Sequence, residues 1–135
     1  MEILVDTSVW SLALRRSKKK ATDAKLLKSF SELINESRVK IIGPIRQELL
    51  SGISEEIQFQ KLRKHLNAFE DLPIHSESYE RAAEMSNYCR KKGVTGSHLD
   101  FLICSIAEYY KLSIFTTDQD FSFYSKHLHL RLYYE

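Results

Sequence analysis

The sequence predicts a three-layer α/β domain, in which a mostly parallel sheet of about five short strands lies between helices. Short apolar runs alternate with longer segments of helical periodicity along the chain, a pattern typical of parallel strands joined by helices. Two apolar runs end in aspartates, Asp6 and Asp118, and each is followed by a helix-like segment. With neither an internal repeat nor a linker, residues 1–135 are expected to form one domain of ordinary length.

The first half of the chain begins with the apolar run at 2–6, which is typical of a buried strand. Leu26, Phe30 and Leu33 recur at helical spacing. Pro44 suits the first turn of a helix that Gly52 ends. The predicted elements here are strand 2–6, helix 7–16, helix 22–36, strand 39–42, helix 44–51 and helix 54–69.

The second half contains one segment, 97–111, that is apolar nearly all round and is therefore expected to be a buried central helix. Pro73 lacks an N–H donor, which favours an edge position for the strand that contains it. Gly93 ends the helix before the central one. The predicted elements are strand 72–74, helix 76–92, helix 97–111, strand 113–117, helix 119–126 and strand 129–133.

The composition is that of a soluble protein, with 43% hydrophobic and 28% charged residues. The N-terminus lacks the basic and apolar parts of a signal peptide, and no apolar run approaches the roughly 18 residues of a membrane helix. We therefore expect a cytoplasmic protein. In a reducing compartment, Cys89 and Cys104 are expected to be small buried residues and not a disulfide.

The net charge of +2 excludes a strongly basic surface, but one segment concentrates positive charge. A solvated loop is the usual explanation of such a run. Beside a site that acts on a polyanion, the same run could contact the phosphates of RNA. The residues concerned are Arg15, Arg16, Lys18, Lys19 and Lys20.

Four acidic residues, Asp6, Glu48, Asp100 and Asp118, lie where a strand hands over to a helix or just inside a helix. Singly, each has a simpler explanation: a helix cap, a favourable helix-dipole contact, or a surface position. Together they favour a metal site, because the carboxyl ends of parallel strands meet at one edge and an apolar helix leaves Asp100 without a cationic partner. Ligands that offer only oxygen indicate a hard ion, Mg²⁺ or Mn²⁺.

Other chemistries fit the sequence less well. A haloacid-dehalogenase phosphatase needs Asp-x-Asp after the first strand, and Ser8 stands at the second position. The chain has neither a glycine-rich phosphate loop nor Gly-x-Ser-x-Gly. His127 and His129 lack the matching Cys or His pair of a zinc site.

Four segments resemble the PIN-domain family, and within it the VapC-type toxins of prokaryotic toxin–antitoxin pairs. They occur in the family's order and span the chain. The N-terminal segment and the last segment are the more specific to the family. The segments are Val5-Asp6-Thr7-Ser8, Glu48-Leu49-Leu50-Ser51-Gly52, Asp100-Phe101-Leu102-Ile103 and Thr116-Thr117-Asp118-Gln119-Asp120-Phe121.

The resemblance implies a Mg²⁺- or Mn²⁺-dependent endoribonuclease that leaves a 5′-phosphate and a 3′-hydroxyl. It also implies a homodimer and a VapB-like antitoxin that covers the site. A non-catalytic RNA- or protein-binding module on the same scaffold is the alternative. The implied catalytic and metal-binding residues are Asp6, Glu48, Asp100 and Asp118, with Ser8 and Asp120 in support.

Two features of the sequence are not explained by the family pattern: residues 104–106 and Trp10. Cys104-Ser105-Ile106 stands where family members often carry small alanines, which bears on packing and not on a ligand. Trp10 lies one turn beyond Asp6 and is either a core residue or, as large aromatic residues near a site often are, an anchor for the antitoxin.

Overall fold

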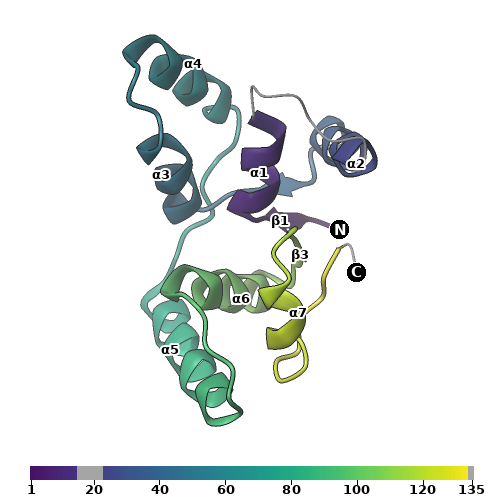
Figure 1. The fold of residues 1–135 in the computed structure, drawn as a ribbon, viewed down its shortest axis with the longest axis vertical. Helices are drawn as coiled ribbons and strands as arrows, with labels where there is room; N and C mark the ends of the chain where they lie inside the picture. The colour runs from purple at the N-terminus through teal and green to yellow at the C-terminus, as the bar shows by residue number, and fades with distance from the viewer. Residues whose placement is uncertain (15–22, 134–135) are drawn as a thin grey trace.

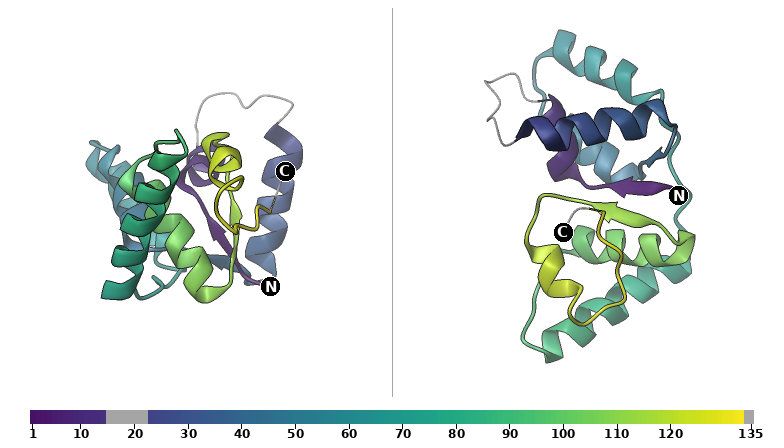
Figure 2. Two further views of the ribbon diagram at one scale, coloured as in Figure 1. Left: turned by 90° about the horizontal axis from the view of Figure 1, so that it is seen from below. Right: turned by 90° about the vertical axis from the view of Figure 1, so that its right-hand side faces the viewer.

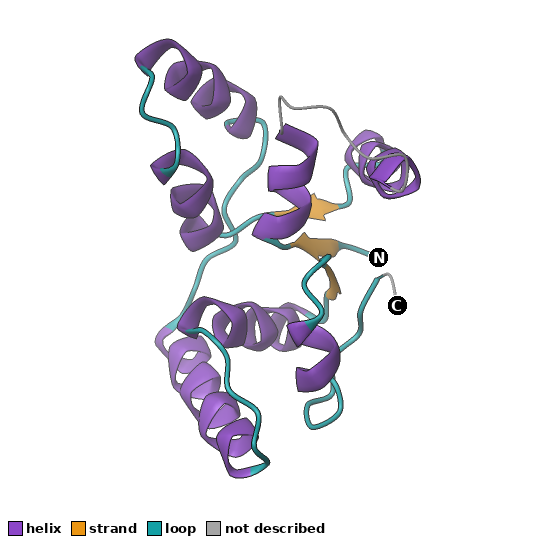
Figure 3. Cartoon of the chain, viewed as in Figure 1, coloured by secondary structure: helices purple, strands orange, loops and turns teal. Residues whose placement is uncertain are grey.

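The computed structural model describes residues 1–14 and 23–133 of the chain (Figure 1). Helices dominate, and the strands are short (Figure 3). In chain order the elements are β1 (Ile3–Val5), α1 (Thr7–Leu14), α2 (Asp23–Asn35), β2 (Val39–Lys40), α3 (Gly43–Ser51), α4 (Glu56–Leu66), α5 (Ser76–Lys91), α6 (His98–Tyr110), β3 (Ser113–Phe115) and α7 (Asp120–Tyr124).

The sheet has the order β2-β1-β3, and both pairings are parallel. Ile3 pairs with Val39 on one side and with Ser113 on the other. Every residue of β1 and β3 is buried, as expected for a parallel sheet with helices on both faces. The predicted α/β class with a parallel sheet and helical connections is confirmed.

The expected number of strands is wrong, because the described part of the chain contains three and not about five. In place of the predicted strands 72–74 and 129–133, the structure has two isolated bridges, Asp71 to Ile41 and Leu132 to Ile114. The amide of Leu72 donates to Ile41 O at 2.9 Å, but Pro73 follows and has no N–H to continue the ladder. At the other edge, pairing is confined to the residues around Ile114.

Helices cover the sheet from both sides, and Figure 2 (right) shows β1 between α2 on one side and α6 on the other. Helix α1 packs against α2 and α3, and α3 packs against α4. On the opposite side α5 packs along α6, which also contacts β3. The three predicted layers are therefore present. No helix in the described ranges is both long and apolar enough to cross a membrane.

Helix α6 is buried on nearly every side, as its sequence predicted. Ser105 is a polar exception, and its hydroxyl donates to the carbonyl of Ser78 in α5 at 2.7 Å. Cys104 lies beside it and Cys89 lies in α5; both are buried free thiols, and burial raises the pKa of each. The expectation that the cysteines are small core residues is confirmed.

Trp10 belongs to the core, with an exposed fraction of 4%. Its ring makes edge-on contacts with Phe30 of α2 and with Phe69, both at 5.1 Å between centroids. Such contacts join the first helix to segments far along the chain. With so little of the ring accessible, the interpretation of Trp10 as an antitoxin anchor is not supported.

Arg46 of α3 fastens the end of α4 to the connection that follows it. Its Nη1 and Nη2 donate to the carbonyls of Leu66 and Phe69, and its Nε donates to Asp71 Oδ1 at 3.0 Å. The carbonyl of Leu66 also accepts from the amide of Phe69 at 3.0 Å, and the guanidinium adds a charged donor both to it and to the carbonyl of Phe69.

We predict that Arg46→Ala lowers the free energy of unfolding by about 2 kcal/mol, because it leaves the carbonyls without their charged donor. Arg81→Ala is the matched control, since Arg81 makes a bidentate contact to Glu108 on a more exposed surface. The control should cost less than about 1 kcal/mol. Urea unfolding of the three proteins measures both changes. Equal destabilisation by the two variants would contradict the role given to Arg46.

Candidate metal centre

The four acidic residues singled out from the sequence line one pocket of about 290 Å³. Asp6 directly follows β1, and Asp118 lies three residues beyond β3. Because β1 and β3 are parallel neighbours, both aspartates emerge at the same edge of the sheet. Asp100 reaches this edge from the first turn of α6, and Glu48 reaches it from α3.

Asp6 has an exposed fraction of 6%, and two hydroxyl groups hold its carboxylate. Its Oδ2 accepts from Ser8 Oγ at 2.9 Å and from Thr116 Oγ1 at 2.7 Å. At the start of α1, the backbone carbonyl of Asp6 accepts hydrogen bonds from the amides of Val9 and Trp10. The two hydroxyls therefore orient the side chain and converge on one of its two oxygens.

The hydroxyls of Ser8 and Thr116 also tie the ends of β1 and β3 together. They lie 3.3 Å apart, and each accepts a backbone amide at 3.0 Å: Thr117 N donates to Ser8 Oγ, and Asp118 N to Thr116 Oγ1. Thr116 was not among the predicted site residues. Its hydroxyl lies two residues before Asp118 in the Thr-x-Asp segment, and this spacing is the signal that could have identified it.

Asp100 lies in a first turn capped by Ser97, whose Oγ accepts from the Asp100 amide at 3.0 Å. Its Oδ2 accepts a hydrogen bond of 2.6 Å from the hydroxyl of Tyr124 in α7. The pKa of this carboxyl is raised above its usual value, mainly by burial. Hydrogen bonds from Tyr124 and Ser97 oppose this shift, and the negative charges of Asp118 and Asp6 add to it. The sequence offered no signal for Tyr124.

Asp118 also has a structural role at the start of α7. Its Oδ1 accepts from the amide of Asp120 at 2.9 Å, a local turn that satisfies a free amide at the helix start. Carboxylate oxygens of Asp100, Asp118 and Asp120 lie within 4.8 Å of one another. Asp6 and Glu48 line the pocket but, within the described residues, stand outside this closer group.

The donor set fits a hard divalent cation. Carboxylate and hydroxyl oxygens are the ligands that Mg²⁺ and Mn²⁺ prefer. No ion pair joins a Lys, Arg or His of residues 1–14 or 23–133 to any of these acids, so the negative charges have no protein counter-ion there. The basic run of Arg15, Arg16 and Lys18 to Lys20 lies outside the described residues.

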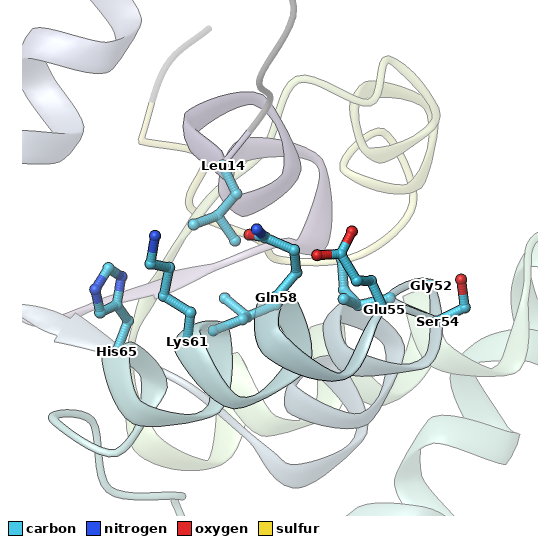
Figure 4. A pocket seen from close by; sticks show the side chains of 9 residues that line it. Leu14, Gly52, Ser54, Glu55, Gln58, Lys61 and His65 are labelled. Carbon is cyan, nitrogen blue, oxygen red and sulfur yellow. The ribbon is translucent and has the colours of Figure 1, made fainter.

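Larger pockets than this one lie elsewhere on the surface. One of them, of about 450 Å³, lies between Leu14, at the end of α1, and the face of α4 that carries Gln58, Lys61 and His65 (Figure 4). Among the described residues that line it, Glu55 is the one acid, so these residues provide no convergent carboxylates. The smaller pocket at the sheet edge, where the carboxylates converge, is therefore the candidate metal site.

The comparisons with known proteins agree with this architecture. The fold is similar to FitAcB from Neisseria gonorrhoeae (TM-score 0.75, 19% identity, 96% of this chain and 95% of the other). It is also similar to VapBC2 from Rickettsia felis bound to a promoter DNA fragment (TM-score 0.74, 17% identity, 98% and 97%). No curated protein matches the sequence. The family model "PIN domain" matches residues 3–126, and the chain therefore belongs to the PIN domain family.

Proposed function

We propose that this chain is a divalent-metal-dependent endoribonuclease and the toxin of a type II toxin–antitoxin pair. One observation carries the proposal: in a PIN domain, Asp6, Glu48, Asp100 and Asp118 all line a single pocket. Acidic residues so arranged, without a cationic partner in the described part of the chain, suit metal-assisted hydrolysis of a phosphodiester.

In this proposal, Asp6, Glu48, Asp100 and Asp118 hold Mg²⁺ or Mn²⁺. When bound, the metal activates water and neutralises charge on the phosphate and the leaving oxygen. Ser8 supports the site by orienting Asp6, to whose Oδ2 it donates. These residues together require no catalytic histidine.

Asp120 supports the same site from the first turn of α7, where its carboxylate lies close to those of Asp100 and Asp118. For Arg15, Arg16, Lys18, Lys19 and Lys20 the proposed role is to contact phosphates of the RNA, on the strength of their charge alone.

The proposed partner is a VapB-like antitoxin that covers the acidic pocket. The support is likeness of fold to complexes whose names include both components, such as VapBC2 and a toxin–antitoxin complex from Klebsiella pneumoniae (TM-score 0.63, 21% identity, 90% and 91%). We further propose that the chain acts as a homodimer in the cytoplasm, where its RNA substrate is found.

Purified protein tests the activity directly. We expect it to cleave RNA in the presence of Mn²⁺, to leave 5′-phosphate ends, and to stop when a chelator is added, because the acids need the metal to activate water. Production of the chain alone should arrest bacterial growth, and a cognate antitoxin should relieve the arrest. RNA binding without cleavage, with or without Mn²⁺, would favour the non-catalytic module instead.

A further inference from the structure

We propose that Tyr124, seated by Gly96, is a positioning residue that holds the Asp100 carboxylate in its metal-binding orientation. The inference rests on the proposed function, because it assigns a role in the same acidic site. It adds two residues to that site, neither of which lies among the acids or in the hydroxyl pair of Ser8 and Thr116.

The first support is the burial and orientation of Tyr124. Its exposed fraction is 0%, and its ring lies 4.9 Å from that of Phe101 and 5.2 Å from that of Phe121 between centroids. From this packed position the hydroxyl donates to Asp100 Oδ2 at 2.6 Å. A ring enclosed in this way cannot swing aside, so its hydroxyl presents one donor at a set place.

The second support is the close approach of Gly96 to the same ring. A Cβ built on Gly96 would overlap the Tyr124 hydroxyl, and it would lie 2.7 Å from Tyr124 Cζ and 3.0 Å from Phe101 Cε2. Any side chain here would therefore push the ring away from its place. The next residue, Ser97, caps the helix that carries Asp100, so one short loop locates both partners of the hydrogen bond.

The hydrogen bond from Tyr124 fixes the orientation of the Asp100 carboxylate. A carboxylate with one oxygen held by a hydroxyl keeps its plane and presents its remaining electron pairs in one direction. An ionised carboxylate only accepts hydrogen bonds, so the Tyr124 hydroxyl is the donor in this contact. Outer partners of this kind commonly change metal affinity by about 10- to 100-fold when removed.

Tyr124→Phe removes only the hydroxyl, and we expect it to weaken Mn²⁺ binding by about 10-fold in titration calorimetry. Tyr110→Phe is the matched control. Tyr110 lies at the other end of α6, and its hydroxyl donates to the carbonyl of Pro73 at 2.6 Å. The Tyr110→Phe variant should be less stable because this hydrogen bond is lost, but its Mn²⁺ affinity should equal that of wild type.

Two further variants separate positioning from general damage. Gly96→Ala keeps the hydroxyl but displaces it, and should also weaken Mn²⁺ binding, which provides a second test if Tyr124→Phe does not fold. In an Asp100→Asn protein, adding Tyr124→Phe should weaken Mn²⁺ binding no further, because Tyr124 acts through Asp100.

Undiminished Mn²⁺ affinity in folded Tyr124→Phe, or an equal loss in Tyr110→Phe, would overturn the inference. So would an additional loss from Tyr124→Phe in the Asp100→Asn protein. These results would leave the proposed function intact, provided that wild type binds Mn²⁺ and cleaves RNA. A wild-type protein that binds no Mn²⁺ would overturn both.

Discussion

Replacing Asp6 by asparagine is expected to reduce RNA cleavage by about 1000-fold while the protein stays folded. The amide oxygen can still accept the two hydrogen bonds from Ser8 and Thr116. The NH₂ group must then occupy the place of the other carboxylate oxygen, and it has no lone pair to offer a metal ion. The substitution therefore removes a ligand and retains the contacts that orient the side chain.

Initial rates of RNA cleavage in Mn²⁺, together with melting curves, measure the effect. Glu77→Gln makes the same change of carboxylate to amide on the exposed side of α5, and it should cleave RNA like wild type. Growth should follow the same order, with arrest by wild type and by Glu77→Gln but not by Asp6→Asn at equal protein level. Wild-type cleavage by Asp6→Asn would remove Asp6 from the site.

Mn²⁺ at about 100 times its dissociation constant is expected to stabilise the wild-type fold by about 2.7 kcal/mol, which is roughly 10 °C in melting temperature for a chain of this size. Without metal, the carboxylates of Asp100, Asp118 and Asp120 face one another within 4.8 Å, and their like charges oppose folding. A divalent ion binds only the native arrangement and relieves that repulsion.

Asp118→Asn separates the two roles of this residue. Asparagine caps about as well as aspartate, so the bond from the Asp120 amide to Oδ1 can persist. The variant should melt at a higher temperature than wild type in a chelator, and it should respond much less to Mn²⁺. Glu77→Gln should shift with Mn²⁺ as wild type does. An identical Mn²⁺ shift in Asp118→Asn and wild type would mean that Asp118 is a cap and not a ligand.

The sequence was sufficient to predict an element where the residues of that one segment determine its structure. Ile3-Leu4-Val5 is continuously apolar because a central parallel strand is covered on both faces, and β1 lies there. The apolar run of α6 and the ends marked by Pro44 and Gly93 likewise follow from side-chain and backbone chemistry within a few residues. The positions of the acids at strand ends and helix starts could likewise be predicted from the few residues around each of them.

Partners that meet across the fold could not be read from local pattern. Tyr124 and Asp100 are 24 residues apart, and Thr116 and Asp6 are 110 residues apart, so only the parallel pairing and the seating of α7 bring each pair into contact. The strand number failed for the same reason. An apolar run shows that a segment can pair, whereas a ladder needs a neighbour in register and a free N–H at each step, which Pro73 lacks.

The sequence by itself determined the fold class, the central helix and the acids that could hold a metal, because periodicity, capping and residue chemistry are local. The tertiary structure decided the extent of the sheet and the hydroxyls that hold Asp6 and Asp100. It also gave a reason for glycine at position 96, where the ring of Tyr124 leaves no space for a side chain. These features depend on the close approach of segments distant in the chain, and close packing determines which atoms meet.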